Sequence, residues 1–284
     1  MNINGLLYDE ESSRRFDFNK LRAYPIEFYL SPQDIQSLNN IATSVKWQSN
    51  INKKYKAMDD IMAKRGFKKY ACGTNRRIYR FMEDDSILFK VAYDRVGIED
   101  NPKEYINQKF LQPYVAKMFQ TTECGTIGCV ERLVPFKHRY EFESVAGDIF
   151  DLLFKKILGV YILDDIGTNS FMNYGIRQGF GPCLLDYPYL YEVDLDKLVC
   201  KNRLPNGSIC HGYIDYDIGF NKLVCEKCGK TYTASSIGKL PDIKLKNSPI
   251  IEETSSDANK FRYKIIKDKK VIIDHSHKES DIIY

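Results

Sequence analysis

The chain has 284 residues, of which 43% are hydrophobic and 28% are charged. This composition is typical of a globular protein and excludes a disordered one. No uninterrupted apolar run approaches the roughly 20 residues that a membrane-spanning helix needs. The net charge of +4 is too small to indicate nucleic-acid binding by itself. Because the first residues lack the basic and apolar regions of a secretory signal, we expect a cytoplasmic protein.

Residues 1–66 are expected to form an N-terminal extension with two helices. The first helix begins at residues 31–34, Ser-Pro-Gln-Asp, where a capping hydroxyl precedes a proline and a carboxylate follows three residues later. Apolar residues then recur at helical spacing. The second helix is predicted over residues 51–65 and should end at Gly66.

From residue 67 onward, short alternating runs separated by turn residues predict a three-stranded antiparallel meander. Pro102 and the acids around it then predict the first turn of a helix. In chain order, we predict strands at 67–72, 78–82 and 87–93, a helix at 100–119, strands at 125–128 and 129–134, a helix at 144–163 and a strand at 183–186.

Four of the eight cysteines lie close together late in the chain: Cys200, Cys210, Cys225 and Cys228. In an intracellular protein, such clustering favours a metal site over disulfides. The C-x2-C pair followed by Gly229 is typical of a zinc knuckle, and four thiolates form a closed structural site. Because residues 200–232 contain too little core to fold alone, Zn2+ would supply their folding energy.

Other interpretations of this segment remain open. The four cysteines are alternatively unrelated buried residues, and His211 is a possible substitute ligand that we rank below them. Residues 197–247 contain nine basic and four acidic residues, so a nucleic-acid partner has only weak support. Tyr213, Tyr216 and Phe220 could stack on bases, but we expect them to pack in the small core.

The central region contains polar residues in an order that indicates chemistry. Gly73 lies in the first predicted hairpin, and Lys90 lies in the third predicted strand. Glu104 belongs to the helix that follows. The later residues are Glu131 at the end of a strand, Asp164 and Asn169 with D-x4-N spacing in a loop, and Asp186 at the end of an apolar strand.

This order resembles the protein-kinase-like fold, which includes aminoglycoside phosphotransferases and short kinase-like proteins of bacteria and phages. In that fold a lysine of the third strand binds ATP phosphates and pairs with a glutamate of the next helix. Lys90 and Glu104 match these two positions. Gly73 matches the glycine-rich loop, and Glu131 matches the start of the hinge that carries adenine.

The resemblance also implies roles for the later residues. Asp164 matches the catalytic base that accepts the proton of the acceptor hydroxyl. Asn169 and Asp186 match the oxygen ligands of Mg2+. The implied activity is an ATP- and Mg2+-dependent phosphotransferase acting on a hydroxyl acceptor that the sequence does not identify.

The implied fold class is α+β, with a kinase-like two-lobed architecture, an antiparallel N-lobe sheet, a truncated helical C-lobe and a small zinc-stabilised module. The expected domains are the extension at 1–66, the N-lobe-like sheet and helix at 67–135, the reduced C-lobe at 136–199, the zinc module at 200–232, and a linker with a C-terminal hairpin at 233–284.

Several departures from the family pattern support an alternative. Only Gly73 remains of the glycine-rich loop, Ile162 and Leu163 replace the His-Arg of the catalytic loop, and Pro188 replaces the glycine of D-F-G. The alternative is a catalytically inactive kinase-like binding protein whose zinc module and N-terminal helices contact a protein or nucleic-acid partner. The composition, rich in Lys, Asn, Ile and Tyr, resembles that of phage or low-GC bacterial proteins, and a phage-encoded protein would act in the host cytoplasm.

Overall fold

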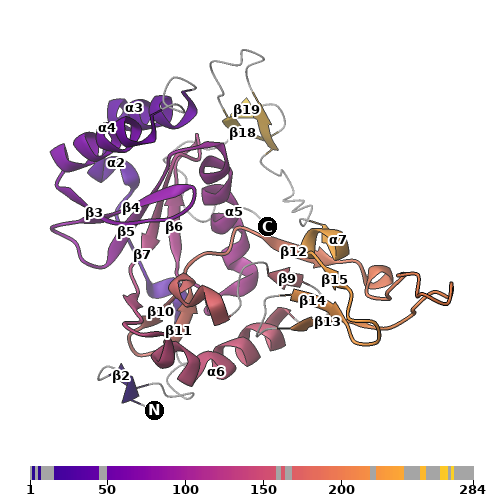
Figure 1. Cartoon of the computed structure of the whole chain (residues 1–284). Coiled ribbons are helices and arrows are strands. Elements are labelled where there is room, and N and C mark those ends of the chain that lie inside the picture. The colour runs from indigo at the N-terminus through magenta and orange to yellow at the C-terminus, as the bar shows by residue number, and fades with distance from the viewer. Residues whose placement is uncertain are drawn as a thin grey trace. The chain divides into compact units, whose positions relative to one another are not determined.

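A computed structural model describes residues 2–3, 6–7, 16–44, 50–157, 161–163, 168–217, 222–239, 250–253, 263–267 and 270–271. The protein is mixed α/β with antiparallel sheets (Figure 1). It divides into two compact units. The sheet unit comprises 19–106, 117–132 and 243–284, and the cysteine unit comprises 1–18, 107–116 and 133–242. Within the described residues, none of the helices has the length and hydrophobicity that crossing a bilayer requires.

A five-stranded antiparallel sheet forms the centre of the sheet unit, with the order β3-β4-β5-β7-β6. The predicted meander is confirmed, because β3, β4 and β5 pair antiparallel in succession. The helix α5 (Arg95–Leu111) follows β5 along the chain. The strands are β3 (Phe67–Cys72), β4 (Arg76–Phe81), β5 (Ile87–Ala92), β6 (Met118–Thr121) and β7 (Ile127–Glu131).

Three N-terminal helices, α2 (Ile26–Tyr29), α3 (Pro32–Thr43) and α4 (Ile51–Lys64), cover one face of this sheet, and α5 lies on the other side (Figure 1). The two helices predicted before residue 67 are confirmed as α3 and α4. The Ser31 hydroxyl and the Asp34 carboxylate form the expected capping box of α3.

Apolar side chains of these helices share one core with alternate residues of the strands, because successive side chains of a strand point to opposite faces. Asp59 of α4 also forms hydrogen bonds with residues of β4. Its carboxylate accepts hydrogen bonds from Arg77 Nη2 at 2.5 Å and from the Tyr79 hydroxyl at 2.7 Å. Members of the shared core include Leu38, Met58, Met62, Tyr79, Phe89 and Cys129.

The helix predicted at 100–119 is wrong at both ends. Asp94 is the N-terminal cap, since its Oδ1 accepts a hydrogen bond from the Gly97 N–H at 2.9 Å. Pro102 therefore lies inside α5 and not in its first turn. The helix ends at Leu111, and the last two residues of the predicted helix, 118 and 119, belong to β6.

Two further predictions are corrected. The strands predicted at 125–128 and 129–134 are one strand, β7, preceded by a turn in which the Gly125 N–H donates to the Thr122 carbonyl. Gly125 has a φ of 71°, a conformation that favours glycine. The helix predicted at 144–163 is α6 (Arg139–Ile157) followed by the short strand β9 (Tyr161–Leu163).

In the cysteine unit, α6 shares a core with β10 and β11 that includes Phe142, Leu153, Tyr174 and Leu184. The sheets have the orders β11-β10-β8, β16-β12-β9 and β13-β14-β15. Their further strands are β8 (Val134–Pro135), β10 (Tyr174–Arg177), β11 (Gly181–Leu184), β12 (Leu190–Val193), β13 (Ile214–Asp217), β14 (Lys222–Cys225), β15 (Thr231–Tyr232) and β16 (Gly238–Lys239).

Short elements complete the described chain. A pair of two-residue strands near the start and a three-stranded sheet near the end have the orders β1-β2 and β17-β18-β19. The bounds are β1 (Asn2–Ile3), β2 (Leu6–Leu7), β17 (Ile250–Glu253), β18 (Tyr263–Lys267), β19 (Lys270–Val271), α7 (Ala234–Ile237), and the 3-10 helices η1 (Phe18–Lys20), η3 (Thr168–Asn173) and η4 (Leu195–Lys197).

If α4 is part of the sheet unit's core, Met58→Ala should lower the free energy of unfolding by about 2–5 kcal/mol, because it leaves a cavity at a fully buried position. Urea unfolding measures this change. Lys56→Ala, at an exposed position of the same helix, is the control and should change stability by less than about 0.5 kcal/mol. Equal effects of the two substitutions would contradict the packing.

Candidate functional site

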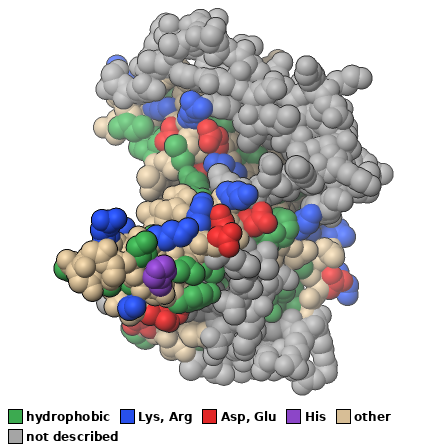
Figure 2. Space-filling view, turned by 90° about the vertical axis from the view of Figure 1, so that its right-hand side faces the viewer, with side chains coloured by type: hydrophobic (Ala, Val, Ile, Leu, Met, Phe, Trp, Pro, Cys, Tyr) green, Lys and Arg blue, Asp and Glu red, His purple; other side chains and the backbone are tan. Residues whose placement is uncertain are grey.

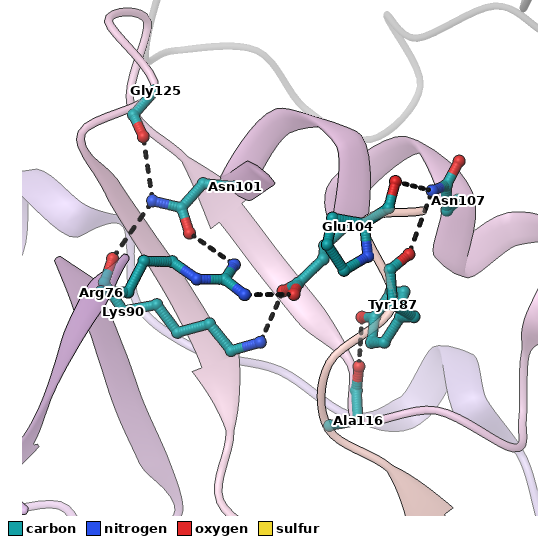
Figure 3. A network of polar contacts seen from close by, with 9 residues as sticks. Arg76, Lys90, Asn101, Glu104, Asn107, Ala116, Gly125 and Tyr187 are labelled. Carbon is teal, nitrogen blue, oxygen red and sulfur yellow. Dashed lines mark hydrogen bonds and ion pairs between the residues drawn. The ribbon is translucent and has the colours of Figure 1, made fainter. Parts of the chain in front are cut away.

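The carboxylate of Glu104 binds two cationic side chains in the sheet unit (Figure 3). Its Oε2 lies 2.6 Å from Lys90 Nζ, and its Oε1 lies 2.8 Å from Arg76 Nη2. The side chains of all three residues are at most 8% exposed. One buried acid therefore joins two strands and a helix.

The sequence positions these three side chains through regular elements. Lys90 lies on β5, the third strand, whose six residues are all buried. Arg76 begins β4, and Glu104 lies in the middle of α5. Because Lys90 and Arg76 alternate with residues that face α3 and α4, both side chains lie on the side of the sheet that faces α5.

Asn101 fixes α5 one helical turn before Glu104 (Figure 3). Its amide nitrogen donates to the Gly125 carbonyl at 2.9 Å and to the Lys90 carbonyl at 3.3 Å, and its Oδ1 accepts from Arg76 Nη1 at 3.3 Å. Gly97 allows the close approach, since a Cβ there would lie 2.3 Å from the Asn75 carbonyl oxygen. The helix is thus held at both its start and its middle.

The buried ion pairs of Glu104 determine what this cluster can do chemically. Burying charges is costly unless they are paired and hydrogen-bonded, so a carboxylate that pairs two cations keeps both of them charged away from water. A lysine held in this way can neutralise non-bridging oxygens of a phosphate. The pairing of Lys90 with Glu104 that the resemblance implies is present in the structure.

Gly73 lies in a tight turn between β3 and β4. Its N–H donates to the Arg76 carbonyl at 2.8 Å. The hydroxyl of Tyr93 donates to the Gly73 carbonyl at 3.2 Å and also contacts the Thr74 carbonyl. This turn is therefore fastened to the residue that follows β5.

Glu131 is the last residue of β7 and is buried. Its Oε2 accepts a hydrogen bond from the Lys117 N–H at 3.0 Å, and its own N–H donates to the Lys117 carbonyl at 2.8 Å. The side chain and backbone of Glu131 thus bind the residue that precedes β6.

In the cysteine unit, Asp186 is half-buried and follows the hairpin of β10 and β11. The Leu185 N–H donates to the Asn173 carbonyl at 2.6 Å. On the other side, the fully buried Tyr187 donates its hydroxyl to the Ala116 carbonyl at 2.6 Å, and its own carbonyl accepts from Asn107 Nδ2 at 3.1 Å (Figure 3). The backbone on both sides of Asp186 is therefore anchored.

The remaining residues of the implied catalytic loop are only partly described. Asn169 lies in η3, and the description extends to its backbone alone. Asp164 lies outside the described residues.

The four clustered cysteines converge in the cysteine unit, so they could hold a metal ion. The Sγ atoms of Cys200, Cys210, Cys225 and Cys228 all lie within 4.8 Å of one another. The Sγ–Sγ distances are 3.7 Å between Cys200 and Cys228 and 3.6 Å between Cys210 and Cys225. In a tetrahedron with Zn–S bonds of about 2.3 Å, sulfur atoms are about 3.8 Å apart.

The surroundings of the cysteines fit a bound cation. The Tyr232 hydroxyl lies 3.0 Å from Cys200 Sγ, and the Asn202 N–H donates to the same sulfur at 3.4 Å. Burial raises the pKa of Cys200, but hydrogen bonds with Tyr232, the Asn202 N–H and the neighbouring cysteines outweigh it and lower the pKa to about 6. Burial raises the pKa of Cys210. A Cβ at Gly212 would lie 2.6 Å from Cys225 Sγ, so glycine keeps the centre open for the sulfurs.

The structure bears on two expectations about this segment. In agreement with its ranking below the cysteines, the exposed His211 is not among the described donors that converge there. Tyr213 is 54% exposed, so the expectation that it packs in the core of the module is wrong. The side chain of Tyr216 and all of Phe220 lie outside the described residues.

Sequence reasoning missed the polar residues that support both clusters. Arg76 and Asn101 complete the Glu104 network, and Tyr232 and Asn202 contact the cysteines. The only sequence signal for Arg76 is the alternation of side chains along its strand, which places Arg76 on a face that the sheet buries. Asn101 carries no signal, because its partners are distant in sequence.

No protein-family model matches the chain, and no curated protein matches it.

Glu104→Ala should lower the free energy of unfolding by about 3–5 kcal/mol, because it leaves two buried cations without their shared carboxylate. Chemical denaturation measures the loss. Glu99→Ala on the same helix is the matched control. Glu99 pairs with Arg95 and Lys103 at the surface, so its removal should cost less than about 1 kcal/mol. A stable Glu104→Ala variant would show that the buried pairs are not needed.

Proposed function

We propose that the chain is a kinase-like, ATP- and Mg2+-dependent phosphotransferase in which Lys90 binds the nucleotide phosphates. The single observation that carries this proposal is the buried ion pair between Lys90 on the third strand of the sheet and Glu104 on the helix that follows. A lysine of this kind neutralises phosphate oxygens, and the carboxylate orients it.

The strand order supports the same proposal. The sheet has five antiparallel strands, α5 lies between the third and fourth of them in sequence, and the fifth strand ends at Glu131. The resemblance requires a third-strand lysine, a glutamate on the next helix and an adenine-binding hinge after the fifth strand. The positions of Lys90, Glu104 and Glu131 are those that it requires.

Asp186 is the proposed Mg2+ ligand in the cysteine unit. It lies two residues after the end of β11 and matches the metal-binding aspartate of D-F-G in the resemblance, and its backbone neighbours are anchored. Asn169 is proposed as the second oxygen ligand and Asp164 as the base for the acceptor hydroxyl. The bound Mg2+ would neutralise charge on the transferred phosphoryl group.

A thermal melt with ATP and Mg2+ tests this proposal. Nucleotide at 100 times its Kd should stabilise the native state by about 2.7 kcal/mol and raise the Tm. Lys90→Met and Asp186→Asn should abolish the shift, whereas Lys103→Met, which changes a surface lysine of α5, should keep it. Lys90→Met should still fold because Glu104 retains Arg76 as a partner. No shift in folded wild-type protein would refute the proposal.

A second candidate is an inactive kinase-like binding protein. The turn at Gly73 favours it, because hydrogen bonds from Tyr93 fasten this turn, whereas a glycine-rich loop must close over phosphates. If this candidate is correct, ATP with Mg2+ leaves the Tm unchanged and Lys90→Met has no effect on partner binding.

We also propose that the four cysteines hold a structural Zn2+. The observation that carries this is the convergence of four Sγ atoms at distances close to those of a zinc tetrathiolate. Four protein ligands leave no open position for a substrate, so the ion stabilises this part of the chain and takes no part in the reaction.

Metal analysis of the purified protein tests the zinc proposal. We expect about one Zn2+ per chain, with Cys225→Ser losing most of it and a strong chelator lowering the Tm. Cys72→Ser is the matched control, since Cys72 is exposed and is not one of the converging cysteines. Metal-free protein whose Tm is insensitive to the chelator would refute a structural zinc.

A further inference from the structure

The segment that carries the first two cysteines forms a two-stranded antiparallel ribbon. Isolated bridges pair Val199 with Tyr213 and Arg203 with Ile209, and backbone hydrogen bonds join the two sides between them. Cys200 and Cys210 are buried, whereas the residues that alternate with them are exposed. The two cysteines therefore lie on the inner face of the ribbon. Its other face, the open face, is exposed to solvent.

Between residues 199 and 203 and between residues 209 and 213, the open face combines hydrophobic and basic side chains, and the exposed Asp215 follows Tyr213 in the same alternation. The hydrophobic members are Val199, Ile209 and Tyr213, which are 40%, 46% and 54% exposed. Lys201 lies between Val199 and Arg203 on one side of the ribbon. Figure 2 shows basic, acidic and hydrophobic side chains interspersed on this side of the protein. The six residues of the open face are Val199, Lys201, Arg203, Ile209, His211 and Tyr213.

We propose that this open face binds single-stranded nucleic acid, with Lys201 and Arg203 on the phosphates and Tyr213 stacked on a base. Exposed aromatic side chains beside basic ones are the chemistry that recognises unpaired bases and their backbone. Lys201 and Arg203 are two residues apart on one side of the ribbon, so their Cα atoms are about 6.6 Å apart along it. This spacing is comparable with that of neighbouring phosphates in an extended single-stranded nucleic acid.

Charges of both signs surround the ribbon near Tyr213. Asp215 and Glu226 are exposed there, and the Glu226 N–H donates to the Tyr213 carbonyl at 3.0 Å. Lys227 is exposed at the same end, where its Cβ would lie 2.6 Å from a Cβ on Gly212.

The two basic residues on one side of the ribbon, Lys201 and Arg203, therefore mark the proposed phosphate contacts, and Tyr213 takes a base. This binding site shares no residue with the proposed phosphate site at Lys90, and the proposal does not depend on that site.

Fluorescence anisotropy with the full-length, zinc-loaded protein and labelled dT12 and rU12 oligonucleotides tests the proposal. We expect Tyr213→Ala to weaken binding about tenfold through lost stacking. Lys201→Glu with Arg203→Glu should abolish binding at 150 mM salt. Replacing both residues by alanine should reduce the salt slope by about 1.4, because each single-strand phosphate contact contributes about 0.7.

Controls keep this test decisive. Lys68→Glu with Lys69→Glu makes the same change in net charge on exposed positions of β3 and should leave binding unchanged. Zinc content and Tm must match wild type in every variant that is compared. The proposal is overturned if neither oligonucleotide binds, if the β3 variant loses binding equally, or if an acidic polypeptide such as polyglutamate competes as well as an oligonucleotide.

Discussion

The carboxylate of Glu104 is the constraint on which the sheet unit depends. Lys90 and Arg76 are tolerated in a buried position because one acid of α5 pairs with both of them. The same contacts determine where α5 packs against the sheet. Asn101 binds the Gly125 carbonyl, and Gly97 lacks the Cβ that would prevent the close approach of the helix. Two cationic side chains are thus paired and oriented at buried positions.

The cysteine unit meets a different constraint, because its cysteine-bearing segment has few large apolar residues. Its small core consists largely of the cysteines themselves with Ile214, Leu223, Ala234 and Ile237. A metal ion bound by the four converging cysteines would supply folding free energy to this segment. This arrangement leaves the outward residues of the ribbon, Tyr213 among them, free of any role in the core.

Local signals made much of the fold predictable. The capping residues at 31–34 and the alternation between 67 and 93 gave the correct helix and meander, since both depend on neighbouring residues. The C-x2-C pair likewise indicated the cysteine cluster. The start of α5 was missed because Pro102 suggested a first turn, whereas Asp94 caps the helix and the proline is accommodated inside it. Contacts such as Asn107 with Tyr187 join residues 80 positions apart, so no local pattern could reveal them.

Covalent labelling tests most directly whether Lys90 binds a nucleotide, as we propose. An adenosine that carries a 5′-fluorosulfonylbenzoyl group reacts with a nearby lysine amine to form a sulfonamide and release fluoride. Peptide mass spectrometry locates the modified residue. The account predicts modification of Lys90 that ATP with Mg2+ prevents. Modification spread over exposed lysines such as Lys68, with no protection by ATP, would contradict it.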